Sequence, residues 1–283
     1  MVSTGGNPTP YGYTWSLTLF LVPSLVLGVW FRQAAIEPIA RRGFWCTVLV
    51  LPLLGFVLDF LLGHLFFEFT YPEATIGLWI PVLGGDTVPI EEFVFYVLGF
   101  IATLLIYVWA DEYWLRAYNV ADYELRSSER GIDRVIKLHW PSLLIGVILV
   151  AISFVFKKCC SEVPEGFPGY FTFLVLAAVI PSMLLYPTAL PFVNWRALSL
   201  TFFILVLISL LWEATLAIPY QWWGYQDRQM MGVFIDAWTN LPLEAVLVWM
   251  VVSYTTVIVY ESVKVFMSLK ATKPWREALL GSR

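Results

Sequence analysis

Seven long apolar stretches constrain this chain more than any other feature of its sequence. They cover roughly residues 15–31, 44–66, 89–109, 140–156, 171–190, 197–219 and 242–260. Each is close to the about 20 residues that a helix needs to cross a hydrocarbon core of about 30 Å. The sequence therefore predicts an all-α, polytopic membrane protein with seven transmembrane helices.

The composition points to the same class. Hydrophobic residues make up 59% of the chain and charged residues 13%, whereas an average soluble domain carries about 25% charge. The first stretch lacks a basic leading region and a small-residue cleavage site, so we expect it to remain as a helix. The net charge of −4 offers no basic face, so we expect membrane lipids and no nucleic acid as surroundings and partners.

Lysine and arginine set the expected orientation. If all seven stretches span, fourteen of the seventeen basic residues share a side with the C-terminus, and the other side has only Lys157, Lys158 and Arg228. The positive-inside rule then places the C-terminus in the cytoplasm and the N-terminus outside, in the cell membrane if the source is bacterial or archaeal. The polar stretch 111–139 becomes a cytoplasmic, partly helical connection.

One structural unit is used twice. A proline followed two residues later by glutamate opens two apolar stretches, at Pro89-Ile90-Glu91-Glu92 and at Pro242-Leu243-Glu244-Ala245. Upstream residues recur as well, because Asp59, Tyr71 and Gly77 match Glu213, Tyr225 and Gly232. The sequence predicts a single membrane domain, 1–283, with parallel three-helix repeats at about 15–109 and 171–266 joined by a linker span at about 140–156.

Five acids fall in the outer half of the predicted bundle: Asp59, Glu91, Glu92, Glu213 and Glu244. Placing an ionisable group in an apolar span costs free energy, so acids that recur at matched positions are better explained by a catalytic role than by packing. Neighbouring side chains on a helix point about 100° apart, and we expect Glu91, the one matched by Glu244, to face the centre. Two plainer explanations stay open: proline and glutamate suit any helix N-terminus, and Asp59 and Glu213 could form interhelical hydrogen bonds.

Aromatic residues accompany the acids. We expect a substrate site lined by Tyr71, Trp79, Pro89, Trp212, Trp222, Trp223, Tyr225 and Pro242. These rings either form an interfacial belt or present electron-rich faces that stabilise a cation.

Acids and aromatic rings in an apolar pocket need neither a metal nor a redox cofactor for catalysis, and we expect none. Cys46, Cys159 and Cys160 show no metal-binding spacing. It suits the electrophilic cyclisation of an isoprenoid within the membrane. A buried carboxylic acid protonates a terminal alkene, an internal double bond attacks the resulting cation, and a carboxylate removes a proton from the ring.

The segment from Tyr71 to Gly77 that leads to Pro89–Tyr96, and its second version from Tyr225 to Trp249, resemble the membrane-embedded lycopene cyclase domain of bacteria, archaea and fungi. That family carries Pro-x-Glu-Glu or Pro-x-Glu-Asp in each of two repeats. The resemblance implies a self-sufficient carotenoid cyclase with a lipophilic, lycopene-like substrate and carotenoid-pathway enzymes as partners. Ala245 departs from the pattern, because the family usually has a second acid there.

The sequence lacks residues that several other classes of membrane protein and isoprenoid enzyme need. A retinal protein needs a lysine in the seventh helix, and the stretch 242–260 has none; an iron-dependent oxygenase needs several histidines, and the chain has two. The magnesium motifs of prenyltransferases and the glycine-rich loop of flavin enzymes are also missing. Two alternatives remain: a cyclase or hydratase of another isoprenoid, and a seven-helix transporter that uses intramembrane carboxylates.

Overall fold

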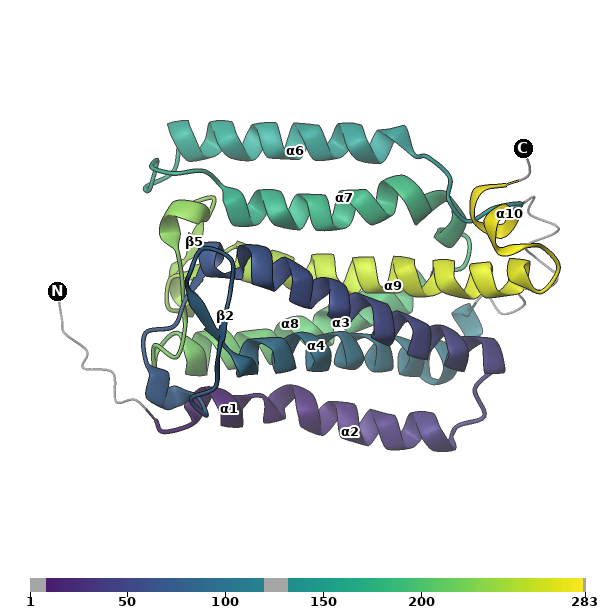
Figure 1. Cartoon of the computed structure of the whole chain (residues 1–283), viewed down its shortest axis with the longest axis horizontal. Helices are drawn as coiled ribbons and strands as arrows, with labels where there is room; N and C mark the ends of the chain where they lie inside the picture. Colours follow the sequence, from purple (N-terminus) through teal and green to yellow (C-terminus); the bar gives the residue numbers. More distant parts are fainter. Residues whose placement is uncertain (1–8, 120–131, 282–283) are drawn as a thin grey trace.

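The structure, a computed structural model, describes residues 9–119 and 132–281, apart from the side chains of Asp59 and Gly63. Seven helices in these ranges are long and apolar enough to cross a membrane (Figure 1). Their bounds are Gly12–Gln33, Pro38–Leu62, Ile90–Trp114, Trp140–Cys159, Gly169–Ala189, Trp195–Ala217 and Glu244–Lys270. The predicted all-α, polytopic fold with seven spans is confirmed.

Several spans combine more than one helical element. The elements are α1 (Gly12–Ser16), α2 (Thr18–Gln33), α3 (Pro38–Phe66), α4 (Ile90–Trp109), α6 (Trp140–Cys159), α7 (Gly169–Ala189), α8 (Trp195–Trp212), α9 (Glu244–Lys270) and α10 (Trp275–Leu280). Two spans end in a π-helical turn: Ala110–Trp114 follows α4, and Glu213–Ala217 follows α8. The seventh helix runs to Lys270, ten residues beyond the predicted end at Tyr260.

Helices α4 and α9 form the centre of the bundle, and the others pack around them in two similar sets. Helix α2 packs on α4 as α7 packs on α9, and both α3 and α8 contact both central helices. Helix α6 packs mainly on α7 at one edge (Figure 1), which is the place of the predicted linker span. This arrangement brings the first helical turns of the two motifs to one end of the bundle.

Three short antiparallel strand pairs cover that end, where α1 begins (Figure 1). The pairs are β2 (Trp79–Pro81) with β3 (Thr87–Pro89), β5 (Phe234–Ile235) with β6 (Leu241–Pro242), and β1 (Phe67–Glu68) with β4 (Gly224–Tyr225). Single 3-10 turns at Pro72–Ala74, Asp227–Gln229 and Asp236–Trp238 complete these connections. The first two pairs are equivalent in the two repeats and each ends on the motif proline, whereas β1–β4 joins one repeat to the other.

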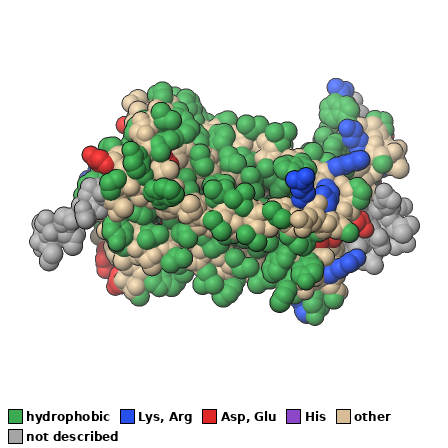
Figure 2. Space-filling view, turned by 90° about the horizontal axis from the view of Figure 1, so that it is seen from below, with side chains coloured by type: hydrophobic (Ala, Val, Ile, Leu, Met, Phe, Trp, Pro, Cys, Tyr) green, Lys and Arg blue, Asp and Glu red, His purple; other side chains and the backbone are tan. Residues whose placement is uncertain are grey.

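Charged side chains separate along the long axis. Figure 2 shows Lys and Arg gathered toward the end where α9 terminates, while hydrophobic side chains cover the length between the two ends. The chain is thus a multi-pass membrane protein, and the outward N-terminus stays a prediction. Residues 120–131 of the predicted cytoplasmic connection lie outside the described part; before them come the π-turn and a 3-10 turn at Arg116–Tyr118.

Candidate functional site

The two motif glutamates Glu91 and Glu244 play the same structural part in their repeats. The Ile76 N–H donates to Glu91 Oε1 at 2.7 Å, and the Met231 N–H donates to Glu244 Oε1 at 2.5 Å. Each donor precedes a glycine with positive φ, 80° at Gly77 and 89° at Gly232, where a side chain would be strained. Each carboxyl therefore holds the turn that leads back to its helix.

A different pair of acids shares a cavity. Glu92 of α4 and Glu213, at the end of α8, both line a cavity of about 70 Å³ between the central helices. Both are buried. Glu91, the acid expected to face the centre, is also buried but does not line this cavity, whereas Glu92 does. Glu244 does not line it either.

Tyrosine hydroxyls hold both cavity acids. Tyr13 donates a hydrogen bond to Glu92, and Tyr225 donates one to Glu213 Oε2. Ser209 donates to the other oxygen of Glu213 at 2.8 Å. Burial of the Tyr225 hydroxyl, together with the nearby Glu213 carboxyl, raises the pKa of Tyr225 well above its ordinary value. The Tyr225 hydroxyl therefore stays protonated and continues to donate.

The π-helical turn after α8 fixes the position of Glu213. The Ile218 N–H donates to the Glu213 carbonyl five residues earlier, at 3.0 Å, and the Trp222 N–H bonds likewise to the Ala217 carbonyl. Such single π-turns are frequent at functional sites because they rotate side chains out of the regular helical order. Here the turn begins at the acid itself.

Aromatic rings form most of the remaining wall. The lining residues are Phe67, Phe95, Tyr96, Gly99, Phe100, Tyr170, Trp212, Trp223, Tyr225, Val248, Trp249 and Val252. Ring centroids of Trp212 lie 4.4 Å from Trp223 and 4.6 Å from Phe95. A cation formed in this cavity would have aromatic rings on several sides, and ring faces stabilise positive charge in an apolar setting.

The predicted substrate-binding residues divide into two groups. Trp212, Trp223 and Tyr225 line the cavity; the ones that do not are Tyr71, Trp79, Pro89, Trp222 and Pro242. Of these, Tyr71 donates to Gln221 at 3.2 Å, and Trp79 pairs with Pro89 in the β2–β3 register. Trp222 packs so closely on Gly12 that a methyl group there would lie 2.4 Å from its ring. Asp59 lies in α3, and its side chain is outside the described part.

Several cavity residues escaped the sequence reasoning. Tyr96, Gly99 and Phe100 follow Glu92 by four, seven and eight residues, the spacing of one helical face, so the motif could have identified them. Tyr13 gave no comparable signal, because it lies 79 residues before its partner Glu92.

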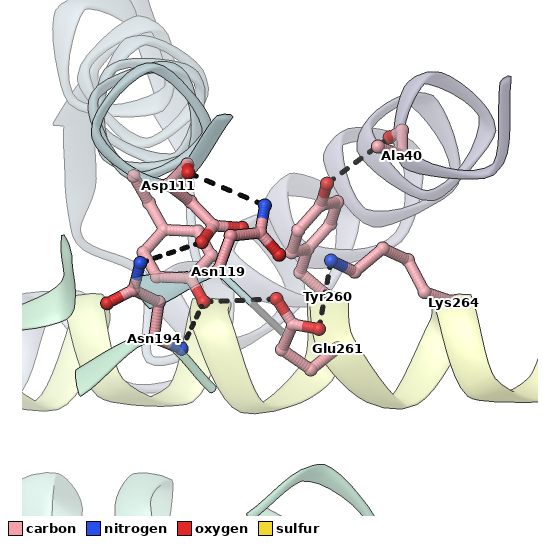
Figure 3. Close-up of polar contacts among 8 residues, drawn as sticks. Ala40, Asp111, Asn119, Asn194, Tyr260, Glu261 and Lys264 are labelled. Atoms are coloured by element: carbon pink, nitrogen blue, oxygen red, sulfur yellow. Dashed lines mark hydrogen bonds and ion pairs between the residues drawn. The ribbon is translucent and has the colours of Figure 1, made fainter. Parts of the chain in front are cut away.

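A second buried polar cluster lies near the other end of the bundle (Figure 3). Lys264 Nζ is 2.9 Å from Glu261 Oε2, and the Tyr107 hydroxyl donates to Glu261 Oε1 at 3.0 Å. The Asn194 backbone N–H donates to the Tyr107 oxygen at 3.1 Å, and its side-chain amide donates to Asp111 Oδ1 at 2.9 Å. All five residues are at most 2% exposed. The cluster ties α9 to the end of α4 and the start of α8.

This cluster corrects two statements drawn from the sequence. The seventh helix does not exclude a retinal protein after all, because α9 extends past Tyr260 and contains Lys264. Lys264 is engaged with Glu261 and does not line the cavity. Asp111, predicted to begin the polar cytoplasmic connection, is instead buried in the bundle.

Comparisons of the chain with protein-family models, with curated proteins and with solved structures found no match. The resemblance to the lycopene cyclase domain therefore rests on the two motifs alone. Within residues 9–119 and 132–281, no group of three or more His, Cys, Asp or Glu side chains is arranged to hold a metal ion.

Proposed function

We propose that this protein cyclises the end of a linear, carotenoid-like isoprenoid inside the membrane, without net oxidation or reduction. One observation carries the proposal: two buried carboxyl groups, each bonded by a tyrosine hydroxyl, line one aromatic cavity. An acid, a base and cation-stabilising ring faces are what such a reaction requires.

We assign the proton-donor role to Glu92. Glu91 and Glu92 are adjacent and both buried, but only Glu92 lines the cavity. Glu91 already accepts hydrogen bonds from Ile76 and Thr14, so its carboxyl is engaged in holding the turn before α4. Glu92 would transfer its proton to the terminal double bond, which leaves a tertiary cation on the substrate and a carboxylate on Glu92.

We assign the base role to Glu213. Both of its oxygens accept hydrogen bonds, one from Ser209 and one from Tyr225, and these bonds hold the carboxyl at the cavity wall. After the internal double bond attacks the cation and closes the ring, Glu213 would take a ring proton and leave a new ring double bond. The proton passes back to Glu92 before the next turnover, so the product is an isomer of the substrate.

The cavity supports one ring closure per binding event. The second repeat carries Ala245 at the position of Glu92, and Ala245 does not line the cavity. One donor and one base therefore serve one substrate end at a time. A substrate with two equivalent ends would have to leave and return reversed before it could gain a second ring.

Expression in cells that accumulate lycopene, followed by chromatography and mass analysis of the pigments, tests the proposal. We expect a ringed product of unchanged mass, and a loss on the order of 100-fold or more in Glu92→Gln and Glu213→Gln, the scale of a positioned acid or base. Equal pigment profiles with and without the wild-type protein would refute cyclisation of lycopene. A product heavier by one water would instead indicate a hydratase.

A transporter is the second candidate, and the buried cluster around Lys264 favours it. Ionisable groups buried at both ends of the same central helices, Glu92 on α4 and Glu261 on α9, are typical of proteins that move ions or protons. Proton uptake by vesicles that contain the protein, abolished in Glu261→Gln and accompanied by no pigment change, would select this function over the cyclase.

A further inference from the structure

We propose that the reacting end of the substrate reaches the cavity from the lipid phase, through the seam between α3 and α4 at Gly55. The identity of the substrate rests on the proposed function, but the access path can be tested without it.

Buried residues form only part of the cavity wall. Glu92, Tyr170, Trp212, Trp223 and Trp249 are all buried. The partly exposed lining residues are Phe67, Phe95, Tyr96, Phe100, Tyr225, Val248 and Val252. The path must therefore pass residues that line the cavity and also reach the surface.

Among these residues, Tyr96 and Phe100 of α4 are the ones that pack against Gly55 of α3. Each lines the cavity and each is partly exposed. On their other side lies Gly55 of α3, where an added methyl group would stand 3.3 Å from the Phe100 ring and 3.4 Å from the Tyr96 ring. The two rings are thus the wall between the cavity and the seam, and they pack so closely on Gly55 that a larger side chain there would press on them.

The outer side of the seam faces lipid. Leu53, Leu54 and Val57 of α3 are exposed apolar side chains, and Pro52 lies three residues before Gly55 within the same helix. A proline removes one backbone hydrogen bond and weakens the helix locally. This segment of α3 can therefore yield more easily than the proline-free helices α4, α8 and α9.

Gly99 provides a place to detect the path. It lies about 10 Å along α4 from Glu92, seven residues at about 1.5 Å each, and it lines the cavity. A Cβ atom at position 99 would meet only Trp249, at 3.9 Å. A cysteine therefore fits there and places its thiol behind the Tyr96 and Phe100 rings.

The experiment uses Gly99→Cys in the full-length protein in vesicles, with Cys46, Cys159 and Cys160 replaced by alanine. Modification is followed with two thiol reagents: small, uncharged methyl methanethiosulfonate, which enters lipid, and its trimethylammonium-ethyl analogue, which does not. We expect the uncharged reagent to react and the charged one to fail from either side. Adding Gly55→Leu should slow the uncharged reaction at least about fivefold, and Phe100→Ala should speed it by a similar factor.

Matched controls separate a specific effect from general disturbance. Gly28→Leu places the same side chain on α2, where nothing lies within 4 Å, and Phe203→Ala removes an exposed ring from α8; neither should change the rate. If Gly55→Leu does not fold, Gly55→Ala should give a smaller slowing. Modification by the charged reagent, or rates unaffected at both Gly55 and Phe100, would overturn the lipid-side path. If the labelling pattern holds while no isoprenoid is cyclised, the path stands and the cyclase proposal falls.

Discussion

Replacing Lys264 with methionine should destabilise the protein by about 3–5 kcal/mol. The Lys264 ammonium is 1% exposed and 2.9 Å from the Glu261 carboxylate, which is fully buried. Methionine keeps most of the volume but leaves the Glu261 charge without its counter-charge, and breaking a buried pair by removing one partner costs about 3–5 kcal/mol. The Tyr107 hydroxyl remains as a neutral donor to Glu261, which does not replace a positive charge.

Removing both charges should recover most of that loss. In Glu261→Gln/Lys264→Met the burial of ions disappears together with their attraction, a change that is often close to neutral. Denaturant titrations in mixed micelles, followed by circular dichroism, give the free energy of unfolding for the wild type, both single variants and the double variant. The double-mutant cycle then yields the coupling between the two side chains.

An exposed pair supplies the control. Lys137 and Asp133 lie 3.3 Å apart with side chains 26% and 60% exposed, so Lys137→Met should cost at most about 1 kcal/mol and depend on salt. The Lys264 effect should be insensitive to salt. A Lys264→Met variant within about 1 kcal/mol of the wild type, with no recovery in the double variant, would show that the pair is not formed as described.

Three further predictions concern the cavity and the topology. Glu91→Gln should retain activity within about tenfold of the wild type, because the amide oxygen can still accept from Ile76, whereas Glu92→Gln should lose about 100-fold or more; pigment yield at equal protein level separates them. Tyr225→Phe removes a hydrogen bond to a carboxyl, worth about 1.5–3 kcal/mol, so turnover should fall about 10- to 100-fold. Alkaline absorbance titration of wild type against this variant should show that Tyr225 ionises above pH 10, since its pKa is raised and its hydroxyl stays protonated below that pH. Single cysteines at the exposed positions Thr87 and Arg228 should both react with an impermeant thiol reagent from outside; reaction at one only would contradict parallel repeats.

The sequence predicted the fold well because the signals for membrane spans are local. Length and apolar character identified all seven helices, and the matched motifs indicated which helices begin at the same end. The missed extension of α9 beyond Tyr260 has a physical cause, since Ser262 and Lys264 look polar in sequence but are buried against other helices. Composition alone does not reveal such pairing.

The candidate site was harder to predict, because the glutamates that recur in both motifs have a structural role, whereas the acids that line the cavity are different ones. Glu91 and Glu244 are the matched acids, and they hold matched turns. The cavity acids are Glu92, whose counterpart is Ala245, and Glu213, whose place depends on a π-helical turn. Neither the rotation introduced by that turn nor the contact from Tyr13, far away in the chain, has a periodic signature.

The β1–β4 pair has a consequence for how the chain could be divided. It joins Phe67 of the first half to Tyr225 of the second, and both residues line the cavity, to which the first half contributes Glu92 and the second Glu213. A cut in the connection between α6 and α7, beside the exposed Glu165, would leave one acid on each fragment. Two such fragments made separately should be inert, and coexpression should restore the cavity by complementation, since the strand pair and the central helices would reassemble across the break.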